Sequence, residues 1–252
     1  QYFKTHPEYY GYSRISRKRE PETLCLTAPG LIETAVENLS VRIEAMKTRP
    51  EYLCLGFRDS WNMCQCERCT APISLPDGSV LKCGSLNPQE DCKYYSTRYL
   101  LFAGEIARRL KKKYPEMMFS GSGYMYGAEP PACEIPEFLL IGFCPIGGVD
   151  SRYPILSAKQ APVWTRRLVE WSNRFPGRIW YYEYYRSYFS GHADITGIGS
   201  IRDKDSQDLR DLKDKLKGPG VISELTPDSE RKFSNHTMKS EWDANTIGAW
   251  LT

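Results

Sequence analysis

The fold prediction starts from the stretch Tyr52-Leu-Cys-Leu-Gly-Phe-Arg-Asp59-Ser-Trp-Asn-Met-Cys64-Gln-Cys66-Glu-Arg-Cys69. Its first residues, 52–57, form a short apolar run that predicts a buried strand, and the carboxylate of Asp59 follows directly. In a βα architecture the chemistry collects at strand ends, because each strand fixes the position of a loop that is free to vary. We therefore expect Asp59 and Trp61 to lie in a substrate cleft, beside a loop that the three cysteines clamp.

The composition is that of an ordinary globular protein. The chain has 252 residues, of which 41% are hydrophobic and 26% charged, so it can bury a sizeable core. The net charge is only +3 and no long basic block occurs, so we expect no nucleic-acid partner. No run of about 18 apolar residues is present, so we expect no membrane span. Aromatic residues reach 13%, and sugar-binding clefts use such side chains as stacking platforms.

Apolar patterns divide the chain into alternating strands and helices. Short apolar runs predict six strands, at residues 23–27, 52–57, 117–126, 138–144, 178–185 and 221–224. Apolar residues at helical spacing predict helices at residues 31–46, 94–114, 163–175, 209–216 and 242–251. Residues 1–22 are predicted to form a loop or a short helical turn. Strands that alternate with helices predict an α/β fold with a parallel sheet and right-handed crossovers.

We predict that this α/β fold is a (β/α)8 TIM-type barrel. Six βα units are recognisable whereas a closed barrel needs eight, so either two strands escape the pattern or the barrel is incomplete. No G-x-G-x-x-G sequence follows the first strand, which argues against a dinucleotide-binding Rossmann domain. We expect residues 1–252 to form a single barrel domain with a cysteine-rich loop insertion at residues 60–92. Because two strands are missing, we also expect the chain to be part of a longer protein.

Carboxylates at strand ends are the candidate catalytic groups. Asp59, Glu183 and Glu224 each lie near the end of a predicted strand. Glycoside hydrolysis needs two carboxyl groups, about 5–5.5 Å apart for retention and about 6.5–9.5 Å for inversion, and one of them must hold a proton. Glu183 lies among tyrosines and Glu224 follows an apolar run, settings that favour the protonated form. We predict Glu183 and Glu224 as the acid/base pair, with Asp59 orienting substrate hydroxyls or replacing one of them.

Five further residues are candidate substrate-binding groups: Trp61, Tyr124, Tyr182, Tyr185 and Arg19. Tyr124 follows glycines that let backbone approach a ligand, and the tyrosines around Glu183 supply hydroxyl donors. Arg19 belongs to a basic cluster. Its guanidinium fork suits a substrate carboxylate, although such clusters more often form a solvated face.

The cysteines have three interpretations. Cys64, Cys66 and Cys69 with Cys83 or Cys92 would form a closed structural zinc site, and we take Cys83 as the fourth ligand. Alternatively, they form disulfides to Cys83, Cys92 or Cys133, although nine cysteines cannot all pair within one chain. Free thiols are the third interpretation. No cofactor is predicted for catalysis, and no basic recognition helix follows the C-x-C-x-x-C spacing, so a nucleic-acid finger is not expected.

Several segments, in their order along the chain, resemble domain-of-unknown-function family 4838. They are His6-Pro7-Glu8-Tyr9-Tyr10, Leu24-Cys25-Leu26, Asp59 with Cys64-x-Cys66-x-x-Cys69, Ile179-Trp-Tyr-Tyr-Glu183-Tyr-Tyr and Gly220-Val-Ile-Ser-Glu224. The resemblance implies a barrel related to alpha-glucuronidases. It further implies a glycoside hydrolase that acts on polysaccharide or oligosaccharide, including uronic-acid-bearing chains. It also implies an exported protein, periplasmic or extracellular, in a polysaccharide-degrading system.

Two classes of function therefore remain open at the level of sequence. One is an enzyme, an alpha-glucuronidase-like glycosidase that works by paired carboxylates. The other is a non-catalytic carbohydrate-binding or inactive barrel module of a larger protein. Both have a carbohydrate partner, and the sequence leaves the oligomeric state open.

Overall fold

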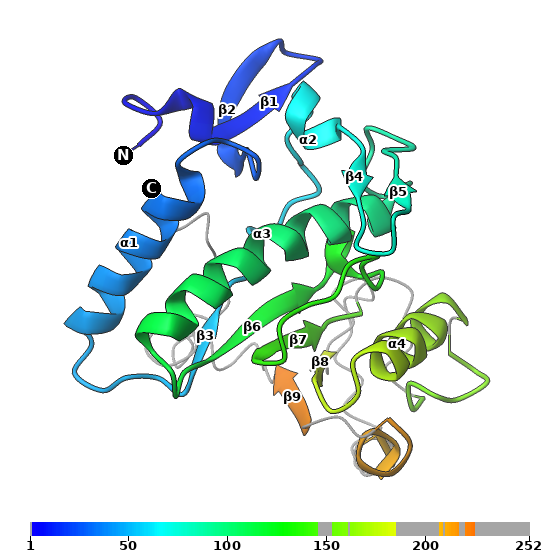
Figure 1. Ribbon diagram of the computed structural model, residues 1–252. Helices are drawn as coiled ribbons and strands as arrows, with labels where there is room; N and C mark the ends of the chain where they lie inside the picture. The colour runs from blue at the N-terminus through cyan, green and yellow to red at the C-terminus, as the bar shows by residue number, and fades with distance from the viewer. Residues whose placement is uncertain are drawn as a thin grey trace, which may run out of the picture. The chain divides into compact units, whose positions relative to one another are not determined.

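The computed structural model (Figure 1) describes the chain over six ranges: residues 2–145, 153–160, 162–184, 207–208, 210–216 and 220–224. For residues 183, 184, 212 and 220–224 the backbone alone is described. The described residues form two compact units, which meet in the sequence between Leu139 and Leu140. Unit 1 precedes this boundary and unit 2 follows it.

Unit 1 begins with a turn and an antiparallel hairpin. The turn η1 (Pro7–Tyr9) leads into β1 (Tyr10–Ser13), which pairs with β2 (Lys18–Leu24). The short turn was predicted, but the prediction of a loop over the rest of residues 1–22 is wrong. The predicted strand at residues 23–27 is also wrong in extent and pairing, because β2 ends at Leu24 and runs antiparallel to β1.

Two long helices form the outer layer of unit 1. Helix α1 (Leu31–Ala45) and helix α3 (Cys92–Lys113) confirm the helices predicted at residues 31–46 and 94–114. The side chain of Asp91 caps α3 by accepting a hydrogen bond from the backbone N–H of Tyr94, and lysines close its last turn, where cations suit the helix dipole. Figure 1 shows α3 lying along β6 with α1 beside it.

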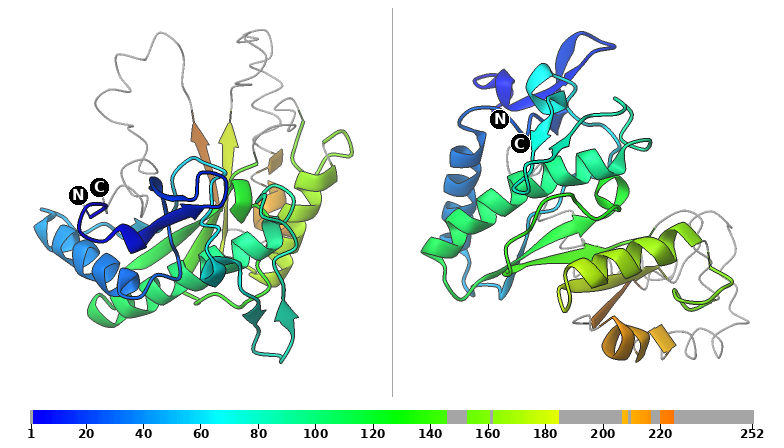
Figure 2. Two further views of the ribbon diagram at one scale, coloured as in Figure 1. Left: turned by 90° about the horizontal axis from the view of Figure 1, so that it is seen from above. Right: turned by 45° about the vertical axis from the view of Figure 1, so that its right-hand side comes forward.

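Beneath these helices, two parallel strands form the centre of unit 1. Strand β3 (Tyr52–Cys54) pairs in parallel with β6 (Met118–Gly123), so that Leu53 lies opposite Phe119. The crossover between them contains the short helix α2 (Glu67–Thr70), the hairpin β4 (Ile73–Ser74) and β5 (Val80–Leu81), and α3. The turn η2 (Met125–Gly127) follows β6. Figure 2 shows the β4–β5 hairpin, in teal, projecting beside the first turns of α3, within the region predicted as a cysteine-rich loop.

Unit 2 holds three parallel strands in chain order. Strand β7 (Leu139–Phe143) pairs with β8 (Ile179–Tyr184), which pairs with β9 (Gly220–Glu224). Helix α4 (Pro162–Arg174) connects the first two strands and buries Trp171 completely. A π-helical turn, η4 (Asp211–Lys215), precedes β9 within the helix predicted at residues 209–216. The predicted helix at residues 242–251 lies outside the described residues.

These pairings confirm the mixed α/β class with parallel strands. Strands β3, β6, β7, β8 and β9 fall within five of the six predicted runs, or differ from them by one residue. Among the described residues, no helix combines the length and the apolar character needed to cross a bilayer.

Tyr99 of α3 joins the two parallel strands of unit 1. Its side chain is 1% exposed, and its hydroxyl donates a hydrogen bond of 2.8 Å to the carbonyl oxygen of Leu55, just after β3. The same hydroxyl accepts a hydrogen bond of 2.8 Å from the backbone N–H of Ser122 in β6. The hydroxyl therefore satisfies two backbone groups that are sealed from water.

We predict that Tyr99→Phe lowers the free energy of unfolding by about 2 kcal/mol, because it leaves two buried backbone groups without a partner. Urea unfolding followed by circular dichroism measures this change. Tyr12→Phe is the matched control, since the hydroxyl of Tyr12 has no hydrogen-bond partner among the described residues. Equal stability of the two variants would contradict the role of Tyr99.

Candidate metal centre and the adjoining pocket

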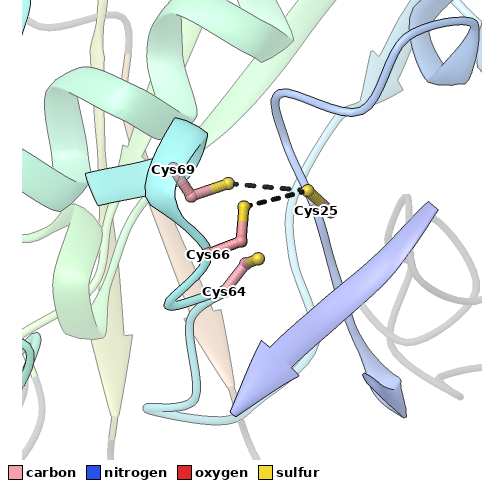
Figure 3. A group of neighbouring side chains, drawn as sticks. All are labelled: Cys25, Cys64, Cys66 and Cys69. Atoms are coloured by element: carbon pink, nitrogen blue, oxygen red, sulfur yellow. Dashed lines mark hydrogen bonds between the residues drawn. The ribbon is translucent and has the colours of Figure 1, made fainter. Parts of the chain in front are cut away.

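Four cysteine side chains converge in unit 1. The Sγ atoms of Cys25, Cys64, Cys66 and Cys69 all lie within 4.8 Å of one another. Figure 3 shows them pointing toward a common centre, Cys25 from one segment, Cys64 and Cys66 from the loop that enters α2, and Cys69 from α2 itself. Cys25 Sγ lies 3.6 Å from Cys66 Sγ and 3.7 Å from Cys69 Sγ.

These separations fit a metal ion and do not fit disulfides. A tetrahedral ZnS4 site with Zn–S bonds of about 2.3 Å has sulfur–sulfur edges of about 3.8 Å. A disulfide bond is about 2.05 Å long. All nine cysteines of the chain are free thiols, and three of the four in the cluster are buried. The cluster can therefore hold a metal ion, and the disulfide alternative is not what the structure contains.

Local backbone geometry brings the four sulfurs together. Cys66 is the N-cap residue of α2 and Cys69 lies one turn later, so the C-x-x-C spacing places both on one end of this helix. Cys25 leaves β2 and is held by its backbone N–H, which donates to the carbonyl oxygen of Tyr9 at 2.8 Å. The hairpin thus delivers one ligand and the loop after β3 delivers three.

Hydrogen bonds around the cluster orient its ligands, as they do around metal sites in general. The backbone N–H of Tyr12 donates to Cys64 Sγ at 3.3 Å, and the hydroxyl of Thr27 lies 3.2 Å from Cys69 Sγ. From α3, the hydroxyl of Tyr94 donates to the carbonyl oxygen of Cys69 at 2.8 Å. The sulfurs are therefore held in place from the hairpin and from α3.

Hydrogen bonds among the cysteines shift the pKa values of their thiols, and a bound cation would change which of them are protonated. Hydrogen bonds from the Cys64 and Cys69 thiols hold the pKa of Cys25 far below its usual range. Hydrogen bonding to Cys25 raises the pKa of Cys64 to about 12, and bonding to Cys25 and Cys64 raises that of Cys69 far above its usual range. The Cys25 thiolate therefore forms readily, whereas the thiols of Cys64 and Cys69 keep their protons. A bound metal ion would displace those protons, because only thiolates ligate it.

The fourth member of the cluster corrects the predicted ligand set. Cys83 was predicted as the fourth ligand, but its thiol donates to the carbonyl oxygen of Ser85 at 3.2 Å and lies 3.7 Å from the hydroxyl of Tyr95. Cys92 is likewise absent from the cluster and donates to the carbonyl oxygen of Pro88. Cys25 takes this place because the β1–β2 hairpin carries it back to α2. In the sequence, Cys25 stands between two leucines, and nothing in that short apolar run indicates a metal ligand.

A pocket adjoins the metal centre and is walled by the same two segments. One wall comes from residues 22–26 around Cys25, and another from residues 56–63, which lead into Cys64. The remaining wall comes from α3 and η2. The ring of Phe57, from the second wall, stacks on that of Tyr126, from η2, with centroids 4.0 Å apart. The pocket therefore combines aromatic surface with the polar side chains of its rim.

The predicted site residues of unit 1 lie in different settings. Asp59 accepts a hydrogen bond of 3.0 Å from the hydroxyl of Tyr124, so two of the predicted residues meet at the ends of paired strands. Trp61 is half-buried between two residues that line the pocket. The guanidinium of Arg19 donates to the carbonyl oxygens of Glu8 and Tyr10, so it serves the hairpin itself.

The other predicted residues belong to unit 2. Glu183 lies opposite Ser223, and Tyr184 lies opposite Glu224, at the carboxyl ends of β8 and β9. The two glutamates thus occupy neighbouring parallel strands and are offset by one residue. Tyr182 is 7% exposed, and Tyr185 lies outside the described residues.

We predict that the chain binds one thiophilic divalent ion and that Cys25→Ser abolishes tight binding, because three thiolates leave the site open. Titration with Co²⁺ measures binding, since a tetrahedral sulfur site gives intense visible absorption. Cys83→Ser is the matched control and should bind like the natural sequence. If Cys83→Ser loses the ion and Cys25→Ser keeps it, the assignment of the cluster is wrong.

The sequence matches one protein family, described as Domain of unknown function (DUF4838), over residues 1–196. No curated protein and no solved structure matches the chain. The matched range contains the hairpin, the four cysteines of the metal centre, the pocket and strand β8. The chain therefore belongs to the DUF4838 family.

Proposed function

We propose that the chain is a glycoside hydrolase that uses strand-end carboxylates of a (β/α)8 barrel. The observation that carries the proposal is the register of β8 and β9, which places Glu183 and Glu224 at the carboxyl ends of neighbouring parallel strands. Carboxyl ends of parallel strands are where barrel enzymes hold their reacting groups. The parallel pairings linked by helices, in both units, support the barrel.

In this proposal one glutamate is the general acid and protonates the glycosidic oxygen. The other glutamate attacks the sugar or activates a water molecule. The two positions are offset by one residue, with Glu183 next to last in β8 and Glu224 last in β9. The proposal keeps Asp59 as the alternative to one of them, and within unit 1 its carboxylate accepts a hydrogen bond of 3.0 Å from the hydroxyl of Tyr124.

The substrate in this proposal is a polysaccharide or oligosaccharide, including uronic-acid-bearing chains, and the protein is exported. Aromatic surface in the pocket of unit 1 supports a sugar ligand, because the C–H face of a pyranose packs against aromatic rings. We propose zinc as the ion of the four-cysteine centre. Four thiolates leave no open coordination position, so the ion is structural and the carboxylates carry the chemistry.

We predict that Glu183→Gln and Glu224→Gln each lower turnover of aryl-glycosides or uronic-acid oligosaccharides by at least about 100-fold, because glutamine can neither donate nor accept the proton. Asp59→Asn tests the replacement role in the same assay. Glu170→Gln is the control, since Glu170 is exposed on α4 and pairs with Arg166. Circular dichroism confirms that each variant is folded.

Full turnover by both Glu183→Gln and Glu224→Gln would overturn the assignment of the pair. If the natural sequence binds oligosaccharides but cleaves none of a glycan library, the chain is a non-catalytic carbohydrate-binding module.

A further inference from the structure

The metal ligands are sequence neighbours of the residues that wall the pocket. Leu24 and Leu26, on either side of Cys25, line the first wall. Asn62 and Met63, which precede Cys64, line the second. An ion held by the four sulfurs would therefore be bonded to the side chains of Cys25 and Cys64, each of which adjoins a residue of the pocket wall in the sequence.

Little else in the described part of the chain joins these two walls. No hydrogen bond connects residues 22–26 with residues 56–63 there. The polar links between the hairpin and the cysteine loop lie elsewhere, where Arg14 donates to Gln65 Oε1 at 2.9 Å and Gln65 donates to the carbonyl oxygen of Tyr12 at 2.8 Å. Without an ion, the two walls are linked by these hydrogen bonds, by the hydrogen bond of 3.3 Å from the backbone N–H of Tyr12 to Cys64 Sγ, by the contacts of the Cys25 thiol with the other thiols, and by side-chain packing.

The third wall of the pocket, formed by α3 and η2, is held by contacts that involve no cysteine of the cluster. Tyr99 is fully hydrogen-bonded beneath it, and its ring meets that of Phe57 edge-on at 5.0 Å between centroids. At Gly127 there is no room for a Cβ atom, because the carbonyl oxygen of Ser122 occupies its place and Phe57 Cε1 would be 3.4 Å away. Backbone and aromatic rings are thus packed tightly here, so this wall does not depend on an ion for its position.

The chemistry of the pocket indicates its ligand. Phe57 and Tyr126 supply flat apolar surface, and the exposed side chains of Arg58 and Asn62 supply hydrogen-bond donors at the rim. Arg58 has no ion-pair partner among the described residues. A sugar ring combines an apolar C–H face with a rim of hydroxyl acceptors, and this combination matches the pocket.

We propose that a metal ion in the four-cysteine centre fastens the two walls of this pocket, so that binding of a sugar ring in the pocket depends on the ion. The sugar as ligand rests on the proposed function, whereas the fastening of the walls does not. Because a ligand that binds only the folded arrangement stabilises it, removal of the ion should increase local opening of both walls.

Hydrogen–deuterium exchange of the whole chain tests the fastening, with zinc alone as the probe. In the zinc-loaded protein, amides of residues 22–26 and 56–63 should exchange at least about tenfold more slowly than in the chelator-treated protein. Residues 99–110 of α3 should exchange equally slowly in both, which shows that the fold persists. Equal exchange of the two walls with and without zinc would overturn the proposal.

Three variants distinguish loss of the fastening from general unfolding on metal removal. Cys25→Ser should reproduce the rapid exchange of both walls even in the presence of zinc. Cys25→His should restore slow exchange, because three cysteines and one histidine also form a closed zinc site. Cys83→Ser, outside the cluster, should behave like the natural sequence. Rapid exchange in Cys25→His despite bound zinc would mean that the cysteine acts by packing, and would overturn the proposal.

Calorimetric binding of cellotetraose and tetragalacturonate separates this inference from the proposed function. Binding that is lost on zinc removal and in Cys25→Ser supports both. Equal binding with and without zinc overturns the dependence on the ion. If neither sugar binds while zinc still slows exchange in both walls, the sugar ligand is wrong and the fastening role stands.

Discussion

The contact on which unit 1 depends is the convergence of four sulfur atoms within 4.8 Å. Three of them come from one loop, but Cys25 is separated from Cys66 by 41 residues, so the cluster closes a long stretch of chain. Without a cation, hydrogen bonding within the cluster lowers the pKa of Cys25 and raises that of Cys69. The separations of 3.6 and 3.7 Å from Cys25 Sγ to the sulfurs of Cys66 and Cys69 match the edge of about 3.8 Å of a tetrahedral ZnS4 site. A cation held by the cluster would therefore join the hairpin to α2.

Much of the helical and parallel-strand framework could be predicted, because its signal is local. The apolar stripe of α3 buries Tyr95, Tyr99 and Ile106, and that periodicity is visible in the sequence. The β1–β2 hairpin could not be predicted in the same way. Strand β2 has the sequence Lys-Arg-Glu-Pro-Glu-Thr-Leu and buries none of its residues, so it shows no alternation of apolar and polar positions. Its pairing with β1 is decided by backbone hydrogen bonds.

The candidate sites follow the same division between local and non-local signals. The C-x-C-x-x-C spacing predicted three metal ligands, because one helical turn brings them together. The fourth ligand was misassigned to Cys83, which is nearer in the sequence, because the hairpin that delivers Cys25 was not recognised. Asp59 and Tyr124 follow β3 and β6, and parallel pairing of those strands explains why the two side chains meet.

A closed four-sulfur site also restricts which groups can perform chemistry. All four positions of a tetrahedral ion are taken by thiolates, so neither water nor substrate can be activated there. In our proposal the reaction is left to carboxylates at strand ends, and the ion acts only through the backbone that it fixes. The loop that begins at Asp59 serves both purposes, since one end carries a carboxylate and the other carries three ligands. Moving those three cysteines would displace the residues just before them, which line the pocket.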